Sequence, residues 1–126
     1  TTQAGLGQST TVGVGGDPVH GISLAGCVER FIDDPQTDGI IVVGEIGGFE
    51  EEEVAKLVGR VRPGKPVVAL VTGRHAPPER RMGHAGALAT VGSGSAQAKI
   101  DALEDAGVII APHAGSIGET MRAALN

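Results

Sequence analysis

One histidine in this sequence, His84, has neighbours suited to chemistry on its imidazole ring. It lies between Gly83 and the pair Ala85-Gly86, in a segment that opens with Arg80-Arg81. Small neighbours let other groups approach the ring closely, and glycine backbone N–H groups can face an anion. A lone histidine is more often structural, but this setting favours a catalytic or phosphoryl-accepting role. The remaining histidines have no such setting and are expected at the surface: His20, His75 and His113.

Glu45 is the acidic residue best placed to work with a histidine. It follows directly on an apolar run that ends at Gly44, and Gly47-Gly48 come just after it. One interpretation is a carboxylate that caps a turn. The other is a carboxylate that accepts a histidine N–H and so fixes the tautomer of the ring. Position alone does not decide between them.

A second glycine-rich segment offers backbone N–H groups to an anion. Gly92-Ser93-Gly94 precedes a predicted helix, and Gly92 and Gly94 join Gly83 and Gly86 as candidate phosphate-binding residues. The alternative is a flexible loop in which Ser95 caps the helix. The helix that opens on Glu50 to Glu53 is a poorer anion site, because four carboxylates there would repel a negative charge.

The elements that must position these residues alternate along the chain. Short, β-branched apolar runs predict four strands buried on both faces, at residues 11–15, 39–43, 67–71 and 108–111. Between and after them, helical periods begin at Leu24, at Glu50, at Ala96 and at Ile117, the last preceded by a capping-box pattern at Ser116 and Glu119. This alternation predicts an α/β fold with an open parallel sheet and helices on both faces. Ligands gather at the carboxyl ends of such strands, where Glu45 and His84 both fall.

Composition and the remaining motifs exclude several classes of function. The 126 residues fit one domain, numbered 1–126, with a net charge of −5 and neither Trp nor Tyr, so nucleic-acid binding is not expected. Cys27 is the single cysteine, which rules out an intrachain disulfide, and no apolar stretch has the length of a membrane span. No P-loop, dinucleotide fingerprint, zinc-ligand spacing or hydrolase nucleophile elbow occurs. We expect an intracellular protein that does not bind membranes.

Several segments together resemble the carboxy-terminal, phosphohistidine-bearing CoA-ligase domain of succinyl-CoA synthetase alpha subunits and of related NDP-forming acyl-CoA ligases. The resemblance covers nearly the whole chain, and the segments occur in the family's order and spacing. The most specific is Arg81-Met-Gly-His-Ala-Gly86, which surrounds the family's phosphohistidine. The matching segments are residues 5–10 (GLGQST), 14–19 (VGGDPV), 34–37 (DPQT), 44–48 (GEIGG), 65–68 (KPVV) and 80–87 (RRMGHAGA).

This resemblance implies a flavodoxin-like fold and a three-step relay of the tricarboxylic acid cycle. ATP or GTP, held mainly by a beta subunit together with Mg²⁺, would phosphorylate His84, while Glu45 matches the family glutamate that contacts the histidine. The phosphoryl group would pass to a carboxylate, most simply succinate, and CoA would displace phosphate from the acyl phosphate. The resemblance also implies a cytoplasmic location, with the mitochondrial matrix as an alternative.

The departures from the family pattern affect substrate and assembly. The amino-terminal CoA-binding domain of the family has no counterpart in this chain, nor has the domain's first strand, so we expect both from another part or chain. Val91-Gly-Ser-Gly94 replaces a common Gly-Gly-Lys-Gly, and residues 22–26 also differ, which leaves malate or another short acid open. We expect the isolated chain to be inactive, and a free sheet edge to favour homo-oligomers. A non-catalytic docking module of the same fold is the alternative function.

Overall fold

The chain folds around a three-stranded parallel sheet. The computed structural model describes residues 1–17, 19–77, 79–88, 92 and 94–126. Its strands β1 (Ile40–Gly44), β2 (Val67–Val71) and β3 (Ile109–Ile110) lie in the order β1-β2-β3. Ile40 is opposite Val67, and Val68 is opposite Ile109. The predicted α/β class and the parallel sheet are confirmed, and the arrangement is consistent with the flavodoxin-like fold.

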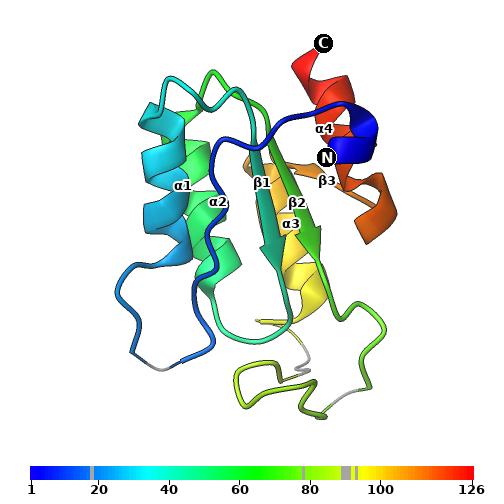
Figure 1. Cartoon of the computed structure of the whole chain (residues 1–126). Helices are drawn as coiled ribbons and strands as arrows, with labels where there is room; N and C mark the ends of the chain where they lie inside the picture. The colour runs from blue at the N-terminus through cyan, green and yellow to red at the C-terminus, as the bar shows by residue number, and fades with distance from the viewer. Residues whose placement is uncertain (18, 78, 89–91, 93) are drawn as a thin grey trace.

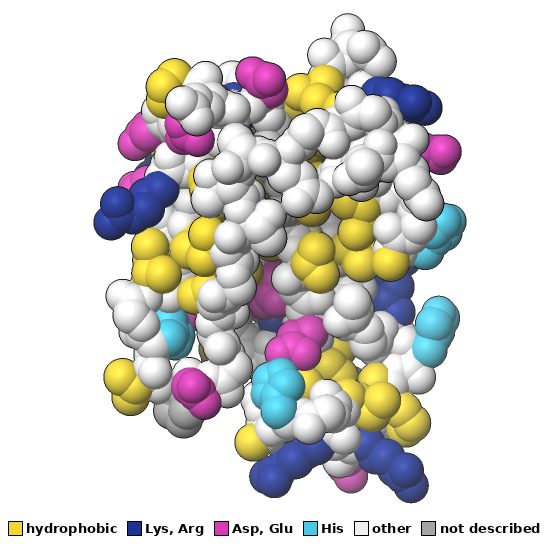
Figure 2. Space-filling model, viewed as in Figure 1, with side chains coloured by type: hydrophobic (Ala, Val, Ile, Leu, Met, Phe, Trp, Pro, Cys, Tyr) yellow, Lys and Arg dark blue, Asp and Glu magenta, His cyan; other side chains and the backbone are white. Residues whose placement is uncertain are grey.

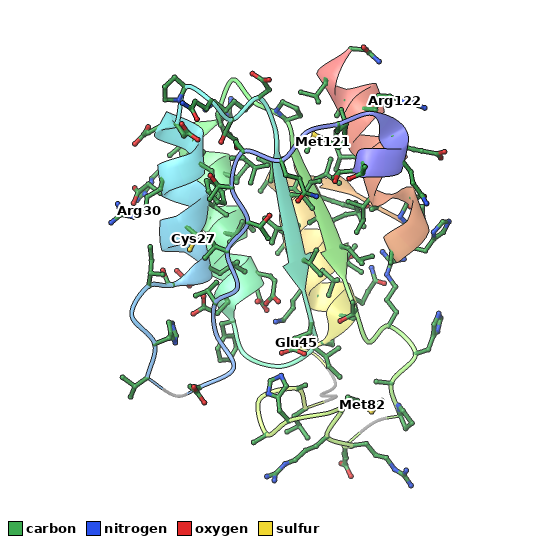
Figure 3. The ribbon with its side chains drawn as sticks, in the orientation of Figure 1. Cys27, Arg30, Glu45, Met82, Met121 and Arg122 are labelled. Atoms are coloured by element: carbon green, nitrogen blue, oxygen red, sulfur yellow. The ribbon has the colours of Figure 1, made fainter. Side chains whose placement is uncertain are left out.

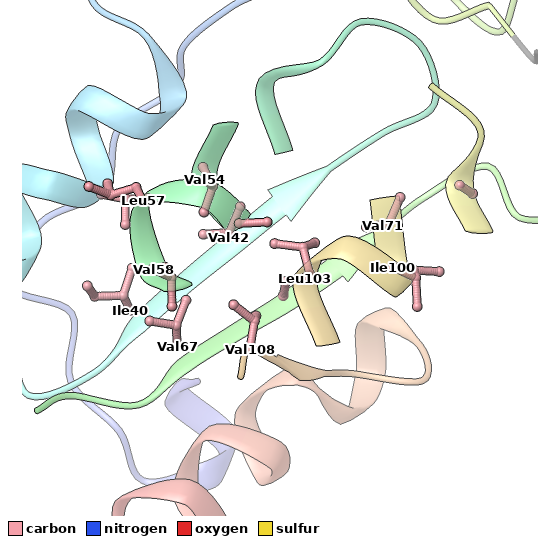
Figure 4. Packing of buried hydrophobic residues seen from close by; sticks show 14 of the residues in the cluster. Ile40, Val42, Val54, Leu57, Val58, Val67, Val71, Ile100, Leu103 and Val108 are labelled. Atoms are coloured by element: carbon pink, nitrogen blue, oxygen red, sulfur yellow. The ribbon is translucent and has the colours of Figure 1, made fainter. Parts of the chain in front are cut away.

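Helices cover both faces of the sheet (Figure 1). One face is covered by α1 (Leu24–Asp33), α2 (Glu50–Val61) and α3 (Ala96–Asp105), and the other by α4 (Ile117–Leu125). Short 3-10 turns occur at Thr2–Ala4 and Ala114–Ser116. The main core is aliphatic, because alternate residues of the strands meet the apolar stripes of these helices. Its members include Val42, Val54, Val71, Ile100 and Leu103 (Figure 4). Met121 of α4 packs on Val68 and Ala111 in a second, smaller cluster.

Serine side chains cap two of these helices. The Ser23 hydroxyl accepts the Gly26 N–H ahead of α1, and the Ser95 hydroxyl accepts the Ala98 N–H ahead of α3. Ser116 was predicted to cap α4 in the same way, and that prediction is wrong. Its hydroxyl donates to the His113 carbonyl at 2.8 Å instead, because the residues ahead of α4 form a 3-10 turn.

The strand predicted at residues 11–15 is also wrong, since this segment forms no secondary structure and pairs with no strand of the sheet. A hollow of about 1080 Å³ is lined by this segment, β1 and α4, among others, and the Val12 side chain is 47% exposed. On the β2 side, the Ile40 N–H donates to the Pro66 carbonyl, and the Gly44 carbonyl accepts the Thr72 N–H. The backbone groups of Ile41 and Val43 therefore face the outer edge of β1. A strand is held by its neighbours, and here that edge is unpaired in the part of the chain that the structure describes.

The carboxyl ends of β1 and β2 lie at the same end of the molecule, where the longest loops gather (Figure 1). Thr72, just after β2, donates both its N–H and its hydroxyl to the Gly44 carbonyl at 2.9 and 3.1 Å. These two bonds hold the exits of the strands together, and the candidate site is built on them. No helix of the described residues is long and apolar enough to span a bilayer.

Candidate functional site

His84 is carried by a tight hairpin between β2 and α3. Arg81 and Leu88 form an antiparallel bridge, and the Met82 N–H donates to the Ala87 carbonyl at 2.8 Å. The His84 carbonyl in turn accepts the Ala87 N–H at 3.2 Å, which closes a turn with the histidine at its start. Ala87 is buried and anchors the hairpin in the core. The imidazole is thus presented on a loop that is fixed at its base.

The structure brings His84 and Glu45 into direct contact, 39 residues apart in sequence. The Nε2 atom of His84 lies 2.6 Å from Oε1 of Glu45, and each side chain is a little under half exposed. In this ring orientation Nε2 donates to the carboxylate, and Nδ1 accepts the Gly86 N–H at 3.2 Å. Figure 3 shows Glu45 at the end of β1, facing the hairpin that carries Met82. The interpretation of Glu45 as the partner of the histidine agrees with this contact.

The Glu45 loop and the His84 hairpin pack tightly against each other at two glycines. Gly47 has φ +86°, and a Cβ there would overlap the Gly86 carbonyl oxygen. The Gly47 N–H donates to the Gly94 carbonyl at 2.9 Å, which ties the same loop to the entrance of α3. Ile46, which lies between Glu45 and Gly47 in the sequence, is buried. Only glycine satisfies both the positive φ and the close approach at position 47, so this residue sets the spacing between the two loops.

The glycines predicted to bind phosphate occupy different settings. Gly83, with φ +92°, precedes the histidine and leaves open space where a side chain would lie, and Gly86 supports the imidazole through its N–H. Gly94 bonds the Glu45 loop, and the Gly92 carbonyl accepts the Ser95 N–H. All four therefore border the site or its supports, and Ser95 caps α3 as the alternative interpretation held. Val91 and Ser93 of the unusual segment lie outside the described residues.

Two buried charged residues behind the site escaped the sequence analysis. Lys99 of α3 is fully buried and pairs with Glu51 of α2, which is 4% exposed. Their spacing along the helices could have indicated that they are buried. On α3 the buried face has the spacing i, i+3, i+4, i+7, which is occupied by Ala96, Lys99, Ile100 and Leu103. Glu51, Val54, Ala55 and Val58 occupy the same spacing on α2. The other histidines, His20, His75 and His113, are exposed as expected.

The arrangement presents a nucleophile with a fixed tautomer at the surface of the molecule. A carboxylate that accepts the N–H of one ring nitrogen stabilises positive charge that develops on the ring. The lone pair of the other nitrogen, Nδ1, accepts the Gly86 N–H at 3.2 Å, and this bond must open before Nδ1 can act as a nucleophile. Figure 2 shows a histidine and an acidic side chain in contact at this end of the molecule, with basic side chains gathered near them. Among the described residues no group of three His, Cys, Asp or Glu could hold a metal ion. The site therefore offers nucleophilic chemistry on an exposed imidazole.

Comparison with known proteins shows which proteins the chain is similar to. The chain is 54% identical over 121 residues to the succinate–CoA ligase (ADP-forming) subunit alpha-2, mitochondrial, of Trichomonas vaginalis, covering 94% of this chain and 39% of that protein. It is 51% identical over 120 residues to the alpha subunit from Aquifex aeolicus, covering 95% and 39%. The chain thus spans about two-fifths of the length of these relatives.

Solved structures give the same fold. ATP citrate lyase of Methanosaeta concilii, a D541A mutant in complex with (3S)-citryl-CoA, superposes with a TM-score of 0.75 at 31% identity, over 88% of this chain and 18% of that one. The enzyme from Methanothrix soehngenii with citrate and coenzyme A gives 0.74 at the same identity and coverage. The family model of the CoA-ligases matches residues 1–109, and the chain belongs to the CoA-ligase family.

Proposed function

We propose that this chain is the phosphohistidine-bearing domain of an NDP-forming acyl-CoA ligase of the succinate–CoA ligase type. The contact of His84 Nε2 with Glu45 Oε1 at 2.6 Å is the observation that carries the proposal. The identity of about half the residues with succinate–CoA ligase alpha subunits supports the same assignment. The whole reaction joins a carboxylic acid and CoA at the expense of a nucleoside triphosphate.

In the first step the Gly86 N–H releases Nδ1 of His84, and Nδ1 forms a bond to the terminal phosphorus of ATP or GTP while the bond from that phosphorus to the leaving NDP oxygen breaks. Glu45 accepts the N–H on the opposite side of the ring and so offsets the charge that the ring gains. In the second step a carboxylate oxygen of the acid attacks the phosphorus, and the N–P bond returns its electron pair to the ring. CoA thiol then attacks the acyl carbon, phosphate leaves, and the thiol proton goes to solvent.

The co-substrates and partners of this reaction are proposed to lie mainly outside this chain. The sequence has no P-loop or dinucleotide fingerprint. Mg²⁺ is proposed to arrive with the nucleotide and to neutralise its phosphate charge. A beta subunit would supply the nucleotide site, and an amino-terminal CoA-binding domain would supply the CoA site. The isolated chain is accordingly expected to turn over no substrate.

Succinate is the acid proposed first, because two relatives that are 54% and 51% identical to the chain are named as succinate–CoA ligases. The structural neighbours bind citrate or (3S)-citryl-CoA, but at 31% identity. Malate and other short dicarboxylic acids are therefore the competitors to test beside succinate. The proposed location is the cytoplasm or the mitochondrial matrix, depending on the organism, because the relatives include a mitochondrial protein and one from Aquifex aeolicus.

The proposal is tested by phosphorylating His84 in the assembled ligase. This chain, the CoA-binding domain and the beta subunit are mixed with Mg²⁺ and γ-labelled ATP, and acid-labile, base-stable label on this chain is counted. We expect the label to be lost in His84→Asn and retained in His75→Asn, which changes an exposed histidine outside the site. Glu45→Gln should slow labelling about 100-fold or more, because it can no longer stabilise the charged ring.

A second set of results would favour the docking module. In that case the assembled complex would form, yet the unsubstituted chain would take up no label, and His84→Asn would assemble unchanged. Label on the chain that survives His84→Asn would contradict the assignment of the phosphorylated residue. Ligase activity of the 126 residues alone would refute the expected dependence on partners.

A further inference from the structure

A buried ion pair lies directly behind the loop that carries Glu45. The Lys99 side chain is fully buried, and that of Glu51 is 5% exposed. Removing two charges from water costs several kcal/mol per ion, and such pairs are often no more stabilising than apolar residues of the same size. The stability of the α2–α3 packing therefore gives little reason for a lysine and a glutamate at these positions.

The two side chains bond the backbone of the Glu45 loop at Glu45 itself and at Gly47. Lys99 Nζ donates to the Gly47 carbonyl at 2.5 Å and to a carboxylate oxygen of Glu51. The other Glu51 oxygen accepts the N–H of Glu45 itself at 2.9 Å. Gly44 makes this possible, since a Cβ at that residue would overlap the Glu51 carboxylate. Three elements, α2, α3 and the end of β1, thus converge on one short loop.

We propose that Lys99 and Glu51 are positioning residues, which hold the Glu45 carboxylate against the His84 ring and thereby set the tautomer and the reactivity of the phosphoryl acceptor. The part that concerns the rate of phosphoryl transfer rests on the proposed function. The part that concerns the geometry of the ring does not, because it can be measured on this chain itself.

The connection from the buried pair to the imidazole runs through contacts alone. Lys99 fixes Gly47, and Gly47 packs on Gly86, whose N–H donates to His84 Nδ1. Glu51 fixes the backbone of Glu45, whose carboxylate lies 2.6 Å from His84 Nε2. Both ring nitrogens are therefore held by groups that the pair supports. Loss of the pair should free the loop to shift, and the ring to lose its single tautomer.

The decisive variant replaces both members together, as Lys99→Met with Glu51→Met. Removing one partner alone would leave an uncompensated buried charge and destabilise the fold by about 3–5 kcal/mol, whereas removing both is often neutral for stability. The chain offers a matched control in Lys56→Met with Glu53→Met. That pair also joins a lysine and a glutamate by an ion pair, but on the exposed surface of α2. Glu51→Asp serves as a second variant, because it keeps both charges and withdraws the carboxylate from Glu45 by one methylene.

The first readout is the ¹⁵N NMR spectrum of the histidine rings at pH 8.5, with His84 assigned from the signals lost in His84→Asn. We expect two well-separated ring nitrogen signals for His84 in the unsubstituted chain and in the surface control, as one tautomer gives. In the buried double variant the two signals should move toward each other, because the two tautomers then mix. If the double variant does not show cooperative unfolding and so is not folded, Glu51→Asp is measured in its place, with the same expected result. Unchanged His84 signals in a folded variant would overturn the proposal.

The second readout separates positioning from binding in the assembled ligase. The rate of His84 phosphorylation at saturating nucleotide should fall about tenfold or more, while KM for the nucleotide stays within about twofold. A raised KM with an unchanged rate would overturn the positioning role. If the unsubstituted chain takes up no label at all, the proposed function fails, and the NMR comparison still decides whether the pair positions the ring.

Discussion

Substitution of Gly47 by alanine should separate the two loops of the site. The residue has φ +86°, so any L side chain is strained there by about 1–2 kcal/mol. Its Cβ would also overlap the Gly86 carbonyl oxygen and lie 2.9 Å from the Leu88 backbone nitrogen. Carbon and oxygen atoms need on the order of 3.5 Å, so the hairpin must retreat by on the order of 1 Å. Such overpacking adds about 1–3 kcal/mol to the loss of stability.

Gly48→Ala is the matched control for this change. Gly48 is the next residue of the same loop and also has positive φ, at +61°, but a Cβ there meets nothing within 4 Å. It should therefore lose only the backbone term, about 1–2 kcal/mol. Urea unfolding of both variants gives the difference in free energy of unfolding, which we expect to be about 1–3 kcal/mol larger for Gly47→Ala.

The same pair of variants also tests the chemistry. A retreat of about 1 Å breaks the 2.6 Å contact of His84 with Glu45, and misplacement on that scale can cost about 100-fold in rate. Labelling of His84 in the assembled ligase should fall accordingly in Gly47→Ala and stay near normal in Gly48→Ala. Equal stability and equal labelling in the two variants would refute the view that Gly47 sets the spacing of the loops.

Two further predictions concern regions outside the site. The Thr37 hydroxyl and the Gln36 N–H donate to the Asp34 carboxylate and hold its pKa in the folded state below the usual 3.8. The ionised carboxylate therefore stabilises the fold at pH values above 3.8, and this stabilisation is lost as the pH falls through the pKa of the folded state. Asp34→Asn should therefore lower the urea midpoint at pH 6 more than at pH 2, and an equal change at the two pH values would contradict this. The outer edge of β1 should also drive self-association, which Val43→Lys should weaken in light scattering over a range of concentrations. A chain that is monomeric at every concentration before substitution would contradict it.

Local patterns predicted the elements that local physics decides. The stripe of Val54, Leu57 and Val58 gave α2, and the β-branched runs at 39–43 and 67–71 gave β1 and β2 within a residue or two. Residues 11–15 (TVGVG) are also rich in β-branched residues but contain two glycines, which weaken a strand, and they form no strand. A strand also needs a neighbour to bond. Nothing in a short apolar run reports whether that neighbour is present.

The meeting of His84 with Glu45 was predictable from the sequence, whereas the residues that support the pair were not. Glycines around His84 and the strand end before Glu45 were enough to place both residues at one edge of the sheet. The role of Glu51 was hidden by its neighbours, because four consecutive glutamates read as a charged helix start. Only the packing of α2 on α3 shows that one of them turns inward to Lys99. A lysine at a core position of a helix is the signal that merits a search for a buried partner.

The exposure of the His84–Glu45 pair fits a relay better than a closed active site. A catalytic histidine that completes its chemistry in one place gains from exclusion of water, since electrostatic interactions strengthen in a dry site. Here both side chains are more than two-fifths exposed, although the loops beneath them are fixed by buried contacts. A phosphoryl group on such a ring can be reached from more than one direction while its point of attachment stays fixed. On the proposed function, the rigid base and open face suit a residue that must receive the group at one site and deliver it at another, with partner surfaces excluding water at each.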